Sequence, residues 1–136
     1  MTSHVFRLPV PPSTNNLYVN IPTRGRVPSM RYKTWRRAAE NELKAQQRPA
    51  EPIAVPVLVE IEVGRKDKRR ADVSNRTKAV EDILVIAKVL ADDLYVADIR
   101  AAWNPDITGC KVKITELEGE FYWRAIGKTA LARDAA

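Results

Sequence analysis

Apolar residues recur at two different periods along the chain, and these periods predict which segments are strands and which are helices. The clearest strand is 55–63, where the odd positions are apolar while Glu60 and Glu62 occupy the other face. Shorter alternating runs predict strands at 5–10, 95–103 and 111–114, and two prolines stop the first of these. Helical segments separate the strands, which indicates one mixed α/β unit.

Two segments carry apolar residues at intervals of three and four, the period of an amphipathic helix. The first helix is expected to begin at Ser29 and to end before Pro49. Its apolar stripe consists of Tyr32, Trp35, Ala39 and Leu43. The second is expected to begin after Ser74, which has the side chain of an N-cap. Its apolar stripe consists of Val80, Ile83, Leu84 and Ala87.

The segments between these elements are predicted from their turn residues. Residues 13–29 read as a long loop; around 24–27, a disordered crossing loop and a functional loop are equal alternatives. The turn residues of 104–109 predict an antiparallel hairpin between the last two strands. Three aromatic residues at 121–123 are expected to pack on a neighbouring element or a partner subunit, and the last ten residues to be disordered.

Together these elements predict a single small domain over residues 1–136, of the α/β (α+β) class. We expect a mixed four-stranded sheet with two main helices, and a partly flexible C-terminal extension from about residue 118 to residue 136. A hydrophobic content of 45% is typical of a folded chain, not of a disordered one.

The charge balance adds a class of partner to this picture. The chain has 23 Lys and Arg against 17 Asp and Glu, a net charge of +6, which favours a polyanion such as nucleic acid. A membrane is the weaker alternative, because no apolar stretch approaches the roughly 20 residues of a spanning helix. Cys110 is the only cysteine, which excludes an intrachain disulfide and a zinc cluster. With no secretory signal pattern at the N-terminus, a cytoplasmic setting is expected.

Acidic residues gather inside the most basic part of the chain. A basic run at 65–70 is followed directly by Asp72, and later by the adjacent pair Asp92 and Asp93. A divalent metal ion that binds a phosphate group needs carboxylate ligands, and nearby cations help to bind the phosphate. Side chains of neighbouring extended residues point to opposite faces, so only one of Asp92 and Asp93 is expected to face such a site.

The second helix would contribute a polar face to the same site. Asn75, Lys78 and Asp82 share one side of it, opposite the apolar stripe. A simpler interpretation exists for each residue: Lys78 and Asp82 would form a surface ion pair worth about 0.3 to 0.5 kcal/mol, and Asp72 would only begin a helix. Taken singly, the simpler interpretation is favoured for each residue. Taken together, and with the order of the motifs described next, the metal site is favoured.

Three motifs occur in a fixed order along the chain. They are PPSTNNLY at 11–18, then Asp72, Asn75 and Lys78 with Asp82, and then Asp92 with Asp93. In this order and spacing the chain resembles the RusA family of Holliday-junction resolvases, small endonucleases of bacteria and phages. The resemblance covers about residues 5 to 117. The family usually has Asp-x-Asp-Asn at the helix start, and here Ser74 stands in place of the second Asp.

The resemblance implies a Mg²⁺-dependent enzyme, with Mn²⁺ as a substitute, whose functional positions are Asp72, Lys78 and Asp93. Asp72 and Asp93 are the expected metal ligands, with Asp82 as a third acid or water-orienting group and Asp92 as the spare acid. Lys78 would balance charge on the phosphate or orient the nucleophile. Ser74 and Asn75 are expected to support these residues.

Ser74 leaves three outcomes open, because a hydroxyl is a weaker ligand than a carboxylate. Another acid, Asp82 or Asp92, replaces the missing ligand; or the enzyme works with one metal; or the protein binds junctions without cutting them efficiently.

The predicted activity is resolution of Holliday junctions by paired symmetric nicks during DNA recombination and repair, by a C₂ homodimer of a bacterial or phage-derived protein. The alternative is a non-catalytic protein that binds branched or single-stranded DNA. A small RNA-binding module is less favoured, because the aromatic and glycine signature of common RNA-binding folds is missing. The expected DNA-binding residues are Asn15, Asn16, Arg24, Arg26, Arg65, Lys66, Lys68, Arg69, Arg70 and Arg76.

Overall fold

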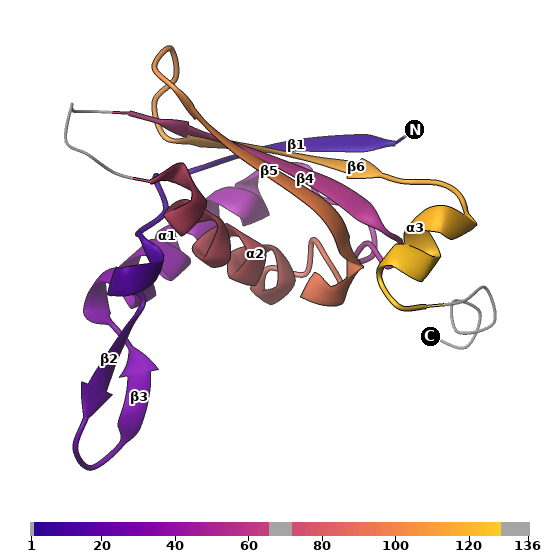
Figure 1. Ribbon diagram of the computed structural model, residues 1–136. Coiled ribbons are helices and arrows are strands. Elements are labelled where there is room, and N and C mark those ends of the chain that lie inside the picture. Colours follow the sequence, from indigo (N-terminus) through magenta and orange to yellow (C-terminus); the bar gives the residue numbers. More distant parts are fainter. Residues whose placement is uncertain (1, 66–71, 129–136) are drawn as a thin grey trace.

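A four-stranded mixed sheet forms the centre of the computed structural model, which describes residues 2–65 and 72–128 (Figure 1). Its strands are β1 (Ser3–Leu8), β4 (Val57–Gly64), β5 (Val96–Asn104) and β6 (Cys110–Glu116). They lie in the order β1-β6-β4-β5, with β4 parallel to β5 and the other neighbours antiparallel. The predicted single α+β domain with a mixed four-stranded sheet is confirmed.

Two helices, α1 (Met30–Ala45) and α2 (Thr77–Ile86), cover one face of this sheet (Figure 1). The apolar stripes predicted for both helices are buried, and they pack with alternate residues of β4 in one core. The β4 contribution to this core is Val57, Val59, Ile61 and Val63. At the start of α1 the Ser29 hydroxyl accepts a hydrogen bond from the Tyr32 N–H at 3.1 Å, which confirms the predicted N-cap.

The segment predicted as a long loop folds instead into a short 3-10 turn, η1 (Thr14–Asn16), and a hairpin of β2 (Tyr18–Ile21) with β3 (Gly25–Pro28). The alternative of a disordered crossing loop is therefore wrong. Gly25 has φ +72°, a conformation that glycine adopts without strain, and it closes the hairpin turn. The hairpin extends away from the sheet, and fully buried Leu17 anchors its base (Figure 1).

The predicted hairpin between the last two strands is wrong, because β4 lies between β5 and β6 in the sheet. The connection at 105–109 crosses the end of β4, where the Gly64 N–H donates to the Gly109 carbonyl at 2.7 Å. A Cβ atom on Gly64 would lie 2.5 Å from the Ile107 carbonyl oxygen. The glycine therefore permits the close approach of the connection to β4.

Helix α2 begins later than predicted. A 3-10 turn, η2 (Val73–Arg76), precedes it, and Asp72 occupies the N-cap position of this turn without a side-chain capping bond. Ser74 lies inside the turn, so the prediction that it caps the helix is wrong. Its carbonyl accepts a hydrogen bond from the Thr77 hydroxyl at 3.1 Å, at the first residue of α2.

After the sheet, a short helix α3 (Glu120–Ala125) returns to the body of the molecule. Trp123 is buried and makes an edge contact with Tyr95, with ring centroids 6.4 Å apart. Phe121 remains 68% exposed. Trp123 thus confirms packing on a neighbouring element of the same chain. The predicted disorder of the last ten residues concerns positions that lie almost entirely outside the described residues.

Across residues 2–65 and 72–128, no helix combines the length and apolar character that crossing a membrane requires.

Candidate active site

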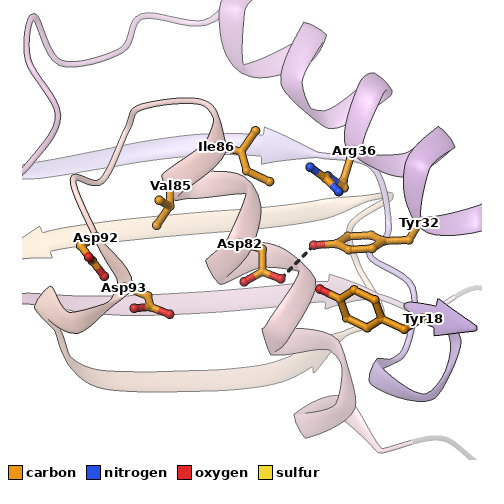
Figure 2. Close-up of a pocket in the computed structure, with 8 residues that line it drawn as sticks. All are labelled: Tyr18, Tyr32, Arg36, Asp82, Val85, Ile86, Asp92 and Asp93. Carbon is orange, nitrogen blue, oxygen red and sulfur yellow. Dashed lines mark hydrogen bonds between the residues drawn. The ribbon is translucent and has the colours of Figure 1, made fainter. Parts of the chain in front are cut away.

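An open pocket of about 370 Å³ lies beside α2, between residues of β2 and α1 and the segment that precedes β5. Figure 2 shows acidic side chains on one side of the pocket and aromatic and basic side chains on the other. The residues that line it are Tyr18, Tyr32, Arg36, Asp82, Val85, Ile86, Asp92 and Asp93. Three of the predicted acids therefore line one pocket, contributed by α2 and by the segment before β5.

Asp92 and Asp93 enter the pocket from a 3-10 turn, η3 (Asp93–Tyr95), that precedes β5. The Asp92 carboxylate caps this turn by accepting the Leu94 N–H at 3.1 Å, and this bond, with the hydrogen bond to the Asp93 side chain, lowers the pKa of Asp92. Both acids line the pocket, so the expectation that only one would face it is wrong. The reason is local: the pair begins a turn and does not belong to an extended strand.

The neighbouring carboxyl groups of Asp92 and Asp93 interact through a hydrogen bond and through their charges. The hydrogen bond with Asp92 raises the pKa of Asp93, and burial and the negative charge of Asp92 act in the same direction. Negative charges crowded in this way are stabilised by a nearby cation. The ammonium group of Lys78 opposes the rise in the pKa of Asp93, and that of Lys128 acts to lower the pKa of Asp92.

Asp82 is held between two partners on α1 and α2. Its Oδ1 atom is 3.1 Å from the Lys78 Nζ atom, and its Oδ2 atom accepts the Tyr32 hydroxyl at 2.9 Å (Figure 2). The hydrogen bond and charge of Asp82 raise the pKa of Lys78. The predicted common face of Lys78 and Asp82 is confirmed, and so is the ion pair that the simpler interpretation expected.

The structure does not gather every predicted acid in this pocket. Asp72 is exposed at the start of η2 and is absent from the pocket lining. Asn75 lies at the junction with the N-terminal motif, where its carbonyl accepts the Thr14 hydroxyl at 3.0 Å. Ser74 is exposed within the turn. The arrangement thus separates Asp72, Ser74 and Asn75, before α2, from the acids of the pocket.

The carboxylates of the pocket could serve a magnesium ion only as part of a small ligand set. Within 2–65 and 72–128, no three or more His, Cys, Asp or Glu side chains form a group that could hold a metal ion. Magnesium is usually held by one or two carboxylates together with water and substrate phosphate, so it does not need such a group. Asp92 and Asp93 are two adjacent carboxylates of this kind on the pocket wall.

The expected DNA-binding residues fall into three groups. Arg24 and Arg26 are exposed on the β2–β3 hairpin, and the Arg26 guanidinium lies 4.8 Å from the centre of the Tyr18 ring. Arg65 is exposed at the end of β4, with its guanidinium 5.1 Å from the centre of the Trp103 ring. Lys66, Lys68, Arg69 and Arg70 lie outside the described residues.

The third group comprises Arg76, Asn16 and Asn15, which lie where the N-terminal motif meets the body of the fold. The half-buried Arg76 donates to the Pro11 carbonyl at 2.8 Å, and burial lowers its pKa, with the nearby Arg31 adding to the effect. Asn16 donates to the Ser13 hydroxyl at 3.1 Å, and its carbonyl accepts the Ser29 hydroxyl at 2.5 Å. Asn15 is exposed in the same turn. The 11–18 motif thus joins the hairpin to the start of α2.

Sequence patterns did not assign Tyr18, Tyr32, Arg36 or Glu81 to the site. Helical spacing places Tyr32 in the core and Arg36 on the outer face of α1, but both line the pocket. The four-residue spacing of Tyr32 and Arg36 was the available signal, because it puts both on one side of a helix. Glu81 is half-buried beside Lys78; burial raises its pKa, while Lys78 opposes the rise.

Comparison with known proteins matches this chain to a nuclease family. Residues 9–115 match the family described as Endodeoxyribonuclease RusA. The chain is 32% identical over 119 residues to proteins named Crossover junction endodeoxyribonuclease RusA from Escherichia coli strain K12, Enterobacteria phage 82 and Shigella sonnei strain Ss046. Each match covers 87% of this chain and 97% of the relative. The chain therefore belongs to the RusA family of endodeoxyribonucleases.

Proposed function

We propose that this protein is a Mg²⁺-dependent, structure-specific endonuclease that resolves four-way DNA junctions by paired, symmetric nicks. The observation that carries the proposal is the pocket lined by Asp82, Asp92 and Asp93, in which Asp82 pairs with Lys78, within the segment that matches the nuclease family. The names of the bacterial and phage relatives support the junction as substrate and DNA cleavage as the reaction.

Phosphodiester hydrolysis needs an ionised water and relief of the charge that builds on the phosphate. A bound Mg²⁺ ion supplies both effects. Asp92 and Asp93 would hold the ion, since their carboxylates are adjacent and already crowded. The Lys78 ammonium would lie against the phosphate oxygens and stabilise their developing charge. The family resemblance also implies a functional role for Asp72, which lies at the start of η2 and outside the pocket lining.

Binding would rely on cations around the pocket more than on base contacts. Arg24 and Arg26 on the hairpin and Arg36 on the pocket wall would contact phosphates near the cut site. Arg65 follows the end of β4 that lies farthest from Asp92 and Asp93, so it would contact phosphates farther from the cut. A junction presents two equivalent strands about an approximate two-fold axis. We therefore propose a C₂ homodimer, with one pocket for each strand, that acts in the cytoplasm.

A second candidate function has a specific observation in its favour. Ser74 replaces an acid of the family pattern, and the part of the chain that the structure describes contains no group of three or more His, Cys, Asp or Glu side chains that could hold a metal ion. A protein with these features would bind branched or single-stranded DNA through its basic surface without cutting it.

Substitution of the acids separates the two candidates. Asp93→Asn keeps the size of the side chain and removes its charge, so the enzyme should lose cleavage by about 100-fold or more while keeping its affinity for the junction. Asp98→Asn is the matched control, because Asp98 is an exposed acid on β5 that is absent from the pocket lining. Equal cleavage by wild type and Asp93→Asn would refute the proposed site. Tight binding with no cleavage by wild type in Mg²⁺ or Mn²⁺ would favour the second candidate.

A further inference from the structure

Tyr32 reaches the acidic pocket although its ring belongs to the core. The residue is only 1% exposed; its ring stacks on Trp35 with centroids 6.4 Å apart and meets the edge of Tyr18 at 5.8 Å. The Arg36 guanidinium lies 5.2 Å from the centre of the same ring. These contacts leave the ring little freedom, so the position of its hydroxyl group is determined by α1 and the core.

The partner of this hydroxyl is a charged group. The hydroxyl donates to the Asp82 Oδ2 atom at 2.9 Å, and burial together with this hydrogen bond raises the pKa of Tyr32. The phenol therefore stays protonated and acts as a donor throughout the neutral pH range. A hydrogen bond to an ionised carboxylate is stronger than one between neutral groups, so it holds the carboxylate firmly.

The fixed carboxylate of Asp82 in turn restricts the position of the Lys78 side chain. With Oδ2 held by Tyr32, Oδ1 is directed to the Lys78 ammonium at 3.1 Å. The Asp82 side chain is 20% exposed and the Lys78 side chain 45% exposed, so the acid is the more restricted partner. A free lysine side chain on a helix surface samples many rotamers, and a fixed carboxylate reduces that number.

We infer that Tyr32 is a positioning residue, which through Asp82 holds the Lys78 ammonium at the edge of the pocket that Asp82 lines together with Asp92 and Asp93. This role rests on the proposed nuclease function, and it differs from the predicted role of Asp82 as a metal ligand. In this role Asp82 supports Lys78, and Asp92 and Asp93, at the start of η3, remain as the metal-binding groups of the pocket. The linkage runs from α1 to α2, so packing between these helices sets the position of a catalytic cation.

The test uses Tyr32→Phe, which keeps the ring and its packing but removes the hydroxyl. Removal of one hydrogen bond of this kind should lower kcat for junction cleavage by about 5- to 10-fold, with the Kd for the junction within about 2-fold of wild type. Tyr122→Phe is the matched control, since Tyr122 lies on α3 and outside the pocket lining. A thermal melt of each variant verifies that it is folded.

A second readout does not depend on cleavage. In NMR spectra of protein labelled at lysine, the side-chain resonance of Lys78 should move in Tyr32→Phe and in Asp82→Asn, and stay in place in Tyr122→Phe. The effects of Tyr32→Phe and Asp82→Asn on kcat should be less than additive, because both interrupt the same linkage.

The outcomes separate the two proposals. A wild-type protein that cleaves no junction overturns the nuclease function, whatever the NMR spectra show. An active wild type in which Tyr32→Phe leaves both kcat and the Lys78 resonance unchanged overturns the positioning role alone. Additive effects in the double variant also overturn it, because they would show that Tyr32 and Asp82 act independently.

Discussion

Replacing Gly64 with alanine tests the arrangement by which the connection between β5 and β6 crosses the end of β4. The added Cβ atom would lie 2.5 Å from the Ile107 carbonyl oxygen and 3.0 Å from the Gly109 carbonyl oxygen. Both are backbone atoms, so no side chain can rotate out of the way. Either the connection or the end of β4 must move.

The cost follows from two effects. Overpacking of this kind typically costs about 1 to 3 kcal/mol, and the hydrogen bond from the Gly64 N–H to the Gly109 carbonyl, 2.7 Å long, would be stretched as the backbones separate. A weakened bond at a buried amide adds about 1 kcal/mol. Gly64→Ala should therefore lower the free energy of unfolding by about 2 to 4 kcal/mol.

Urea unfolding followed by tryptophan fluorescence measures this difference. Thr108→Ala is the control, because Thr108 is exposed in the same connection and its replacement should change the free energy of unfolding by less than about 0.5 kcal/mol. If Gly64→Ala were as stable as the control, the connection could not lie against β4. A direct hairpin between β5 and β6 would then be the better description.

Three other predictions concern the tail, the buried thiol and the hairpin. Trp123→Ala should lower the free energy of unfolding by about 3 to 5 kcal/mol in urea, because it removes a buried aromatic side chain; unchanged stability would show that α3 is not docked. Burial raises the pKa of Cys110 to about 12 from its ordinary value of 9.0, so the folded thiol stays protonated where the unfolded thiol ionises. Unfolding is therefore favoured as pH rises above about 9, and Cys110→Ala should show a smaller loss of stability between pH 9 and pH 12 than wild type; parallel curves would contradict this. Replacing Arg24 and Arg26 with glutamine should reduce the slope of log Kd against log salt concentration for junction binding by about 0.9 for each phosphate that the variant no longer neutralises, and an unchanged slope would place the DNA elsewhere.

The local elements of the fold were predictable because their signals lie close together in the sequence. The stripe from Tyr32 to Leu43 and the cap at Ser29 define α1, and the alternation in β4 defines the central strand. The order of strands was not predictable in this way. Turn residues at 104–109 indicate a reversal of the chain, but they do not say that β4 inserts between the two strands that the turn connects.

The site was predictable in part for a related reason. The motif order selected Asp82, Asp92 and Asp93 together with Lys78, and the structure brings these four into one neighbourhood. The link through Tyr32 could not be predicted, because it joins residues 50 positions apart on two different helices. The sequence also did not predict that the side chains of Asp92 and Asp93 both line the pocket, because this depends on a single 3-10 turn.

Cleavage of a synthetic four-way junction, compared with linear duplex of the same sequence, with and without Mg²⁺, would show whether this protein is a junction-specific nuclease. We predict symmetric nicks in two opposed strands of the junction, none in the linear duplex, and no cleavage without the metal or in Asp93→Asn. Cleavage of junction and duplex at equal rates would contradict structure specificity. Tight junction binding with no nicks in Mg²⁺ or Mn²⁺ would contradict the proposal that the protein cleaves DNA.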